Sequence, residues 1–109
     1  MLLKKNMETR PYSVEISQDA ESDFDKSYNY YLEISPDLAN AFFKSIDGCF
    51  EIIKESPLSY QVIHKSIRRF TLKRFPFVIY YLVDNHTIRI IAIFHTSRNP
   101  QIWTERTVD

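Results

Sequence analysis

The order of predicted elements along this 109-residue chain places it in the α+β class. Three observations establish that order: an apolar–polar alternation near the start, two amphipathic helical patterns directly after it, and three β-rich runs in the second half. Together they predict the order β-α-α-β-β-β. Hydrophobic residues make up 44% of the chain and aromatics 15%, which is enough for one compact domain without cross-links. We therefore expect a flexible tail at residues 1–10 and a single domain at residues 11–109.

The first strand and the first helix follow each other directly. Residues 12–17 alternate apolar and polar side chains, which is the pattern of a half-buried strand. Ser17 is a suitable N-cap, because its hydroxyl can accept a hydrogen bond from a free N–H group of the first helical turn. We expect an amphipathic helix of about four turns. Its predicted buried face consists of Ala20, Phe24, Tyr28, Tyr31 and Leu32, and Asp23, Asp25, Lys26 and Asn29 are expected elsewhere on its surface.

A second helix begins after Ser35, another suitable cap, because Pro36 is favoured at the first helical position. Ser56 and Pro57 end the pattern. The connection between the helices is short, so they are predicted to form an antiparallel hairpin. The predicted buried stripe of the second helix consists of Leu38, Phe42, Ile46, Cys49 and Ile53, and is widened by Phe43 and Phe50.

The second half of the chain is predicted to supply three strands. A loop at residues 57–66 precedes β-rich runs at residues 67–72, 75–83 and 88–94. The last two runs are almost wholly apolar or aromatic, which predicts strands that are buried on both faces. Between them, Asn85 is the residue best suited to the positive φ angle of a tight turn.

Composition and spacing argue against several classes of function. A single glycine cannot build a phosphate-binding loop, and the three histidines and Cys49 lack the close spacing of zinc ligands. Cys49 lies on a predicted buried stripe, where its thiol should stay protonated and inert. We therefore expect no cofactor and no metal. No apolar run is long enough to span a membrane, the longest without tyrosine being residues 90–94, and no leader-like segment follows the basic start, so we expect a cytoplasmic protein.

Charge is distributed unevenly along the chain. Residues 1–59 contain six Lys or Arg and eleven Asp or Glu, a net charge of −5, whereas residues 60–109 contain eight and three, a net charge of +5. One interpretation is mutual neutralisation of helix carboxylates and strand cations; the other is a functional basic face. A face of this kind could hold phosphates, although edge strands also carry cations simply to prevent aggregation. The relevant residues are Arg68, Arg69, Lys73, Arg74, His95, Arg98 and Arg106, with Tyr60, Tyr80 and Trp103 as aromatic neighbours.

Two segments carry a resemblance to a known family. The first is Lys73-Arg74-Phe75-Pro76-Phe77-Val78-Ile79-Tyr80-Tyr81, and the second is Ile91-Ala92-Ile93-Phe94-His95-Thr96-Ser97-Arg98-Asn99-Pro100, followed by Trp103. In this order and spacing, with the strand and helix starts before them, they resemble the RelE/ParE superfamily of type II toxin–antitoxin toxins. The resemblance runs from Tyr12 to Arg106. It implies a helical hairpin packed on one face of a twisted, mostly antiparallel sheet, with the other face partly open.

The resemblance implies two alternative activities. ParE-type members poison DNA gyrase, whereas RelE-type members are ribosome-dependent mRNA endoribonucleases. The residues His95, Arg98, Pro100 and Trp103 look more like the ParE side. Val78 and Thr71 stand where the nucleases have basic groups, so the nuclease would lose charge stabilisation there. A toxin-derived binding module without toxicity is a third alternative.

The expected site residues follow from these alternatives. If the protein is a nuclease, the candidate catalytic residues are Arg69, His95 and Arg98. The resemblance also implies a cognate antitoxin in a hetero-oligomer, and the basic second half would attract an acidic antitoxin segment. The expected partner or target contacts are Arg68, Lys73, Arg74, Trp103 and Arg106.

Overall fold

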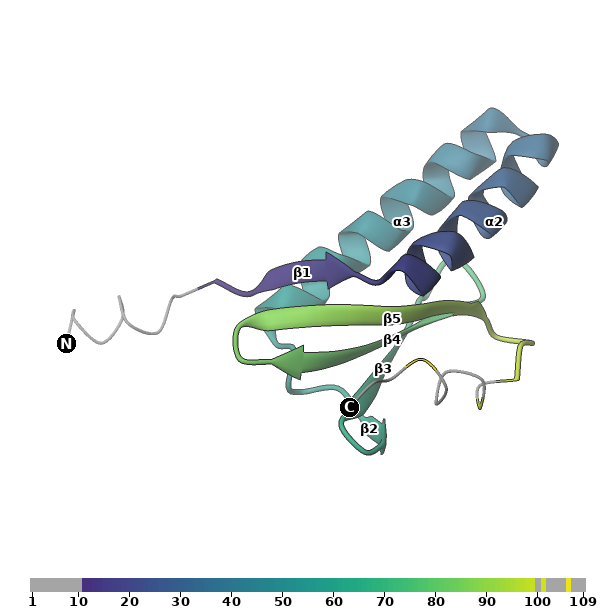
Figure 1. Ribbon diagram of the computed structural model, residues 1–109. Coiled ribbons are helices and arrows are strands. Elements are labelled where there is room, and N and C mark those ends of the chain that lie inside the picture. The colour runs from purple at the N-terminus through teal and green to yellow at the C-terminus, as the bar shows by residue number, and fades with distance from the viewer. Residues whose placement is uncertain (1–10, 100, 102–105, 107–109) are drawn as a thin grey trace.

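The computed structural model describes residues 11–99, 101 and 106, and it confirms the α+β class and the predicted order of elements. Figure 1 shows the two helices packed on one side of the sheet. No helix in the described residues is long and apolar enough to cross a membrane. The elements are β1 (Ser13–Ile16), α2 (Gln18–Ile34), α3 (Pro36–Glu55), β2 (Val62–His64), β3 (Ile67–Thr71), β4 (Phe77–Asp84) and β5 (Thr87–His95).

The five strands form one sheet in the order β1-β5-β4-β3-β2. Only the β1–β5 pair is parallel, and the other pairs are antiparallel. The turn between β4 and β5 contains Asn85 with a φ of 57°, as predicted. The short strand β2 lies within residues 57–66, where the sequence predicts only a loop. Three residues are too few to show a periodic pattern, and β2 is a strand because it pairs with β3.

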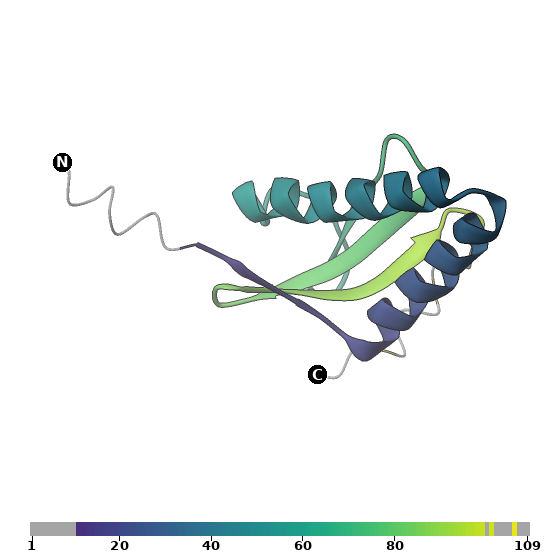
Figure 2. The ribbon, with the colours of Figure 1, turned by 90° about the horizontal axis from the view of Figure 1, so that it is seen from above.

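The two helices begin as the sequence predicts. The Ser17 hydroxyl accepts a hydrogen bond from the Ala20 N–H at 3.0 Å, and the Ser35 hydroxyl accepts one from the Leu38 N–H at 3.3 Å. A single residue, Ser35, separates α2 from α3. Seen from above, the helices are close at this connection and diverge away from it (Figure 2). This divergence decides which of their side chains are covered.

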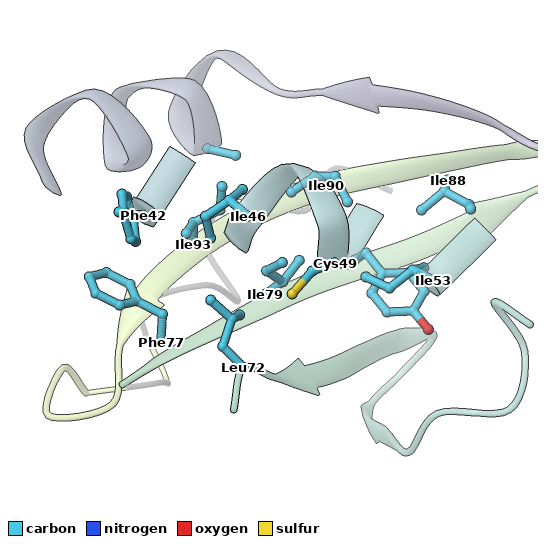
Figure 3. Close-up of a cluster of buried hydrophobic side chains, with 12 residues drawn as sticks. Phe42, Ile46, Cys49, Ile53, Leu72, Phe77, Ile79, Ile88, Ile90 and Ile93 are labelled. Atoms are coloured by element: carbon cyan, nitrogen blue, oxygen red, sulfur yellow. The ribbon is translucent and has the colours of Figure 1, made fainter. Parts of the chain in front are cut away.

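The main core lies between the helices and the sheet. Figure 3 shows apolar side chains of α3 facing those of β4 and β5. Cys49 belongs to this core, and burial raises the pKa of its thiol to about 11, so the thiol is protonated at neutral pH. A second cluster lies on the opposite face of the sheet, so β4 and β5 are covered on both faces as predicted. It consists of Ile67, Val78, Tyr80, Ile91, Ala92 and Phe94.

Three predictions about the helix faces are wrong. Leu32 is 41% exposed and Phe43 is 48% exposed, although both were expected on buried stripes. Leu32 lies two residues before the end of α2, where the hairpin projects past the sheet (Figure 1), and Phe43 lines a groove between α2, α3 and β1. Asp23, expected on the polar surface, is only 7% exposed. Its partners explain this burial and are described below.

Tyr81 links the core to the segment after α3. Its ring is fully buried, and its hydroxyl donates a 2.7 Å hydrogen bond to the Pro57 carbonyl. Burial raises the pKa of Tyr81 to about 12; Arg68 partly opposes this shift, and Tyr60 adds to it. The folded state therefore favours the protonated phenol.

Tyr81→Phe is expected to lower the free energy of unfolding at pH 7 by about 1 kcal/mol, because one buried hydrogen bond is lost and the Pro57 carbonyl is left without it. The raised pKa makes the stability contributed by the phenol fully present below pH 10 and lost as the pH rises toward 12. The stability gap between the two proteins should therefore narrow over that range. Urea titrations at pH 7 and at alkaline pH measure both effects, and a gap that widens above pH 10 would contradict the assignment.

Candidate functional site

Asp23 completes the edge of β5 where β1 ends. The β1–β5 pairing stops at Ile16 and Ile90, so no strand of the described residues accepts the Ile93 N–H. It donates instead to Asp23 Oδ2, at 3.0 Å, from the first half of α2. A buried carboxylate thus takes the place of a strand neighbour and connects the helix directly to the sheet.

Two arginines share the same carboxylate. Arg106 approaches Asp23 with both terminal nitrogens, Nη1 to Oδ2 at 2.7 Å and Nη2 to Oδ1 at 3.2 Å. Arg98 Nη1 lies 3.5 Å from Oδ1. Both guanidinium groups also lie over the Phe94 ring, with their carbons 4.0 Å (Arg98) and 5.0 Å (Arg106) from its centroid. We call Asp23, Arg98 and Arg106 the Asp23 cluster; here two cations that follow β5 offset the charge of a helix carboxylate.

The three residues predicted for nuclease catalysis do line one pocket, of about 300 Å³. Arg69 is exposed there and makes no ion pair with any described residue. Arg98, however, has part of its charge offset by Asp23. His95 Nδ1 accepts the Ser97 N–H at 3.1 Å, and its ring packs edge-on at 5.3 Å against Phe77, which belongs to the core under the helices. The pocket therefore contains all three residues, but Arg98 also pairs with Asp23 and the His95 ring also packs against Phe77.

The predicted partner contacts fall in different places. Arg68 donates to the carbonyl oxygens of Leu58, at 3.0 Å, and Tyr60, at 2.7 Å, so it anchors the segment after α3. Arg106 belongs to the Asp23 cluster, where its side chain is only 16% exposed. Trp103 lies outside the described residues. Lys73 and Arg74 are exposed and lie together beside a groove.

This basic groove, of about 810 Å³, runs between α3 and β3. Its apolar lining includes Ile52, which is 48% exposed. No described carboxylate lines it, and its cations make no ion pair with any described residue. The cations are Lys44, Arg69, Lys73 and Arg74. The groove thus combines apolar surface with four uncompensated positive charges.

One wall of the basic groove is a strand edge that lacks a neighbour. The Arg69 N–H donates to the Gln61 carbonyl at 3.1 Å, and the pairing of β2 with β3 extends no further along β3. The Thr71 N–H points to the same side as that of Arg69, because backbone direction alternates along a strand. In the described part of the chain, no strand covers this end of β3. Its backbone is therefore available to an added extended segment.

Sequence reasoning missed three residues of these sites. Asp23 is flanked by inward positions at i−3, i+1 and i+4, namely Ala20, Phe24 and Ser27, which is a usable signal of burial. Lys44 and Gly48 line the basic groove from α3. A Cβ built on Gly48 would have nothing within 4 Å, so the only glycine of the chain leaves the groove open at that point. The described residues contain no grouping of three His, Cys, Asp or Glu suited to a metal ion.

The helical hairpin on a mostly antiparallel sheet, with a cationic groove beside it, defines a small α+β domain of the RelE/ParE type. Residues 14–100 match the family model described as "ParE toxin of type II toxin-antitoxin system, parDE". The chain therefore belongs to the ParE toxin family of type II toxin–antitoxin systems. This membership places the chain on the ParE side of the superfamily and implies a cognate antitoxin as partner.

Curated relatives and a solved structure agree with this family. The chain is 23% identical over 86 residues to Toxin ParE2 of Mycobacterium tuberculosis, in each of two strains, covering 78% of this chain and 82% of the relative. It also resembles a chain of the "Chromosomal ParDE TA system from P. aeruginosa", with a TM-score of 0.69 and 23% identity, covering 77% of this chain and 95% of the other. The structural likeness confirms the fold.

Asp23→Asn is expected to lower the free energy of unfolding by about 2 to 4 kcal/mol, because it leaves the buried guanidinium of Arg106 without its carboxylate. Asp25→Asn is the matched control: it lies on the same helix, is exposed, makes no ion pair with a described residue, and should change the stability by less than about 0.5 kcal/mol. Denaturant titration measures both values. Equal changes in the free energy of unfolding for the two variants would contradict the structural role assigned to Asp23.

Proposed function

We propose that this ParE-family toxin inhibits growth in the cytoplasm by binding a target such as DNA gyrase, without catalysis and without a cofactor, and that a cognate antitoxin neutralises it. Family membership supports a toxin, and the resemblance of its sequence to ParE-type members points to gyrase. The observation that carries the non-catalytic part is the engagement of Arg98 by Asp23. An arginine held in this way has less charge to offer a phosphate that becomes more negative in a transition state.

The surroundings of the small pocket support the same conclusion. Val78 lines it where the resemblance expects a nuclease to carry a basic group, and it is only 3% exposed. Thr71, the other departure, is exposed and lines the basic groove instead. A pocket floored by valine cannot stabilise developing negative charge at that position. Binding, rather than transfer of a proton or a phosphate, is what these residues favour.

The basic groove is the surface that we assign to the antitoxin. A partner segment with acidic side chains would offset the four cations, and its apolar side chains would cover Ile52 and the apolar lining beside it. If the segment is extended, it can also pair with the unpaired end of β3 at Thr71. Charge, apolar contact and backbone pairing then act on the same segment. Lys73 and Arg74, predicted from the sequence, belong to this surface, and Lys44 and Arg69 join them.

A ribosome-dependent endoribonuclease is the second candidate, because Arg69, His95 and Arg98 do line one pocket. In that function His95 would transfer a proton and the arginines would hold phosphates. A comparison of gyrase supercoiling with transcript cleavage decides between the two candidates.

Purified protein freed of antitoxin is expected to inhibit supercoiling by DNA gyrase, and added antitoxin should restore it. In parallel, transcripts on translating ribosomes should stay intact with the same protein. If supercoiling is unchanged at a large excess of the purified protein over gyrase, gyrase is rejected as the target. Transcripts that are cleaved by the native protein and spared by the Arg98→Ala variant support the nuclease instead. Neither effect, together with no growth arrest on induction without antitoxin, indicates a non-toxic binding module.

Charge reversal in the basic groove should weaken antitoxin binding at least tenfold, because Lys73→Glu with Arg74→Glu turns attraction into repulsion. Lys26→Glu is the matched control: Lys26 is exposed on α2, away from the groove, and its reversal should change the affinity less than twofold. Titration calorimetry at two salt concentrations measures both.

A second variant tests the same groove without changing its charge. Gly48→Leu places a side chain in open space and improves helix propensity by about 0.5 to 1 kcal/mol, so the domain should stay folded while antitoxin binding weakens. Undiminished binding by both the charge-reversed variant and Gly48→Leu would exclude this surface.

A further inference from the structure

A groove of opposite charge lies on the other side of α3, between α3 and α2 and beside β1. Its volume is about 540 Å³, and its apolar lining includes the exposed side chains of Ile16 and Phe43. It lies where the two helices diverge from their connection (Figure 2). Three carboxylates line it, Glu21, Asp25 and Asp47, and among the described residues no cation does. We call it the acidic groove.

The charge of the acidic groove is not offset within the described chain. None of its three carboxylates makes an ion pair with a described residue, whereas Asp19 and Asp23, on the same helix as two of them, face Arg106. Glu15, nearby on β1, is also paired, because its Oε1 lies 3.8 Å from Arg89 Nε. The groove therefore presents three free negative charges around apolar surface, and the ligand that complements it carries Lys or Arg around apolar side chains.

The strand beside the groove has one free edge. Ser13 and Ser17 donate their N–H groups to the carbonyls of His86, at 2.8 Å, and Ile90, at 3.0 Å, on the β5 side. The backbone groups of Val14 and Ile16 alternate with these and so point away from β5. The described part of the chain places no strand on that side, because β1 ends the sheet. Val14 and Ile16 also line the acidic groove, so edge and groove form one continuous surface.

We propose that this surface binds an extended segment of a protein partner, which adds to the free edge of β1 and places basic and apolar side chains over the acidic groove. The backbone groups of Val14 and Ile16 supply hydrogen bonds, Phe43 and Ile16 contact the apolar side chains, and the three carboxylates select Lys or Arg at the ends of the segment.

A second copy of this chain is a poor occupant, because pairing of β1 with itself adds the carboxylates of one copy to those of the other. The acidic antitoxin segment that suits the basic groove would be repelled here for the same reason. The site thus goes beyond the proposed function: it gives the domain a second protein-binding surface, with the opposite charge preference.

Two synthetic peptides with fluorescent labels test the proposal on the full chain. The first, Lys-Thr-Val-Thr-Val-Thr-Lys, places two valines between two lysines on one face of a strand, and the second replaces both lysines with glutamate. Fluorescence anisotropy should show binding of the first peptide and at least tenfold weaker binding of the second. No binding of the lysine peptide overturns the proposal.

Substitutions separate strand addition from simple attraction of charge. Ile16→Pro removes an N–H that points away from β5 and should weaken binding of the lysine peptide at least tenfold, whereas Ile16→Val should change it less than twofold. Asp47→Lys should also weaken it at least tenfold, and Glu33→Lys, an exposed position on α2 outside the groove, less than twofold. Binding to Ile16→Pro equal to that of the native protein overturns the proposal.

Two further measurements keep the proposal testable if Ile16→Pro does not fold. Amide hydrogen exchange of Val14 and Ile16 in the native protein should slow when the lysine peptide is added, since both N–H groups then gain partners. Unchanged exchange at both amides overturns strand addition. Sedimentation that shows a dimer of the native protein, dissociated by the lysine peptide, would instead make a second copy the natural occupant and overturn the assignment to a different partner.

Discussion

The domain depends on how β5 is completed beyond the end of β1. Ile93 lies past the last residue pair of the two strands, and its N–H donates to the buried carboxylate of Asp23. Burying a carboxylate costs free energy unless it is paired, and Arg106 and Arg98 pair with it while covering Phe94 on the far face of the sheet. One side chain therefore connects α2, the end of β5 and the second apolar cluster, which are distant in the sequence.

The cations of these sites fall into two groups, those engaged within the fold and those that line the basic groove. Arg98, Arg106 and Arg68 are engaged by carboxylates or carbonyl oxygens of the same chain and hold the fold together. Lys44, Arg69, Lys73 and Arg74 are engaged by no described carboxylate and line the basic groove. Both readings of the charge asymmetry thus hold, in different places: neutralisation in the Asp23 cluster and a basic face at the unpaired end of β3. Because α3 separates this face from the acidic groove, one small domain presents two surfaces of opposite charge.

Local patterns were sufficient for most of the architecture. The caps at Ser17 and Ser35 and the turn at Asn85 are decided by interactions within a few residues, so they follow from sequence spacing alone. Leu32 and Phe43 show where this reasoning stops. Helical periodicity assigns a side chain to a face, but the divergence of α2 and α3 and the limited length of the sheet decide whether anything covers that face. The short strand β2 likewise exists only through its pairing with β3.

The sequence by itself determined the class, the order of elements, the burial of β4 and β5 on both faces, and the resemblance to the toxin family, because these depend on local periodicity and on residues in fixed order. Only the tertiary structure decided which charges are offset. Asp23 and Arg106 are 83 residues apart and Asp23 and Arg98 are 75 apart, and no spacing rule connects them. The charges that a groove presents to a ligand are those that no such long-range pair offsets. They therefore depend on the three-dimensional positions of the side chains.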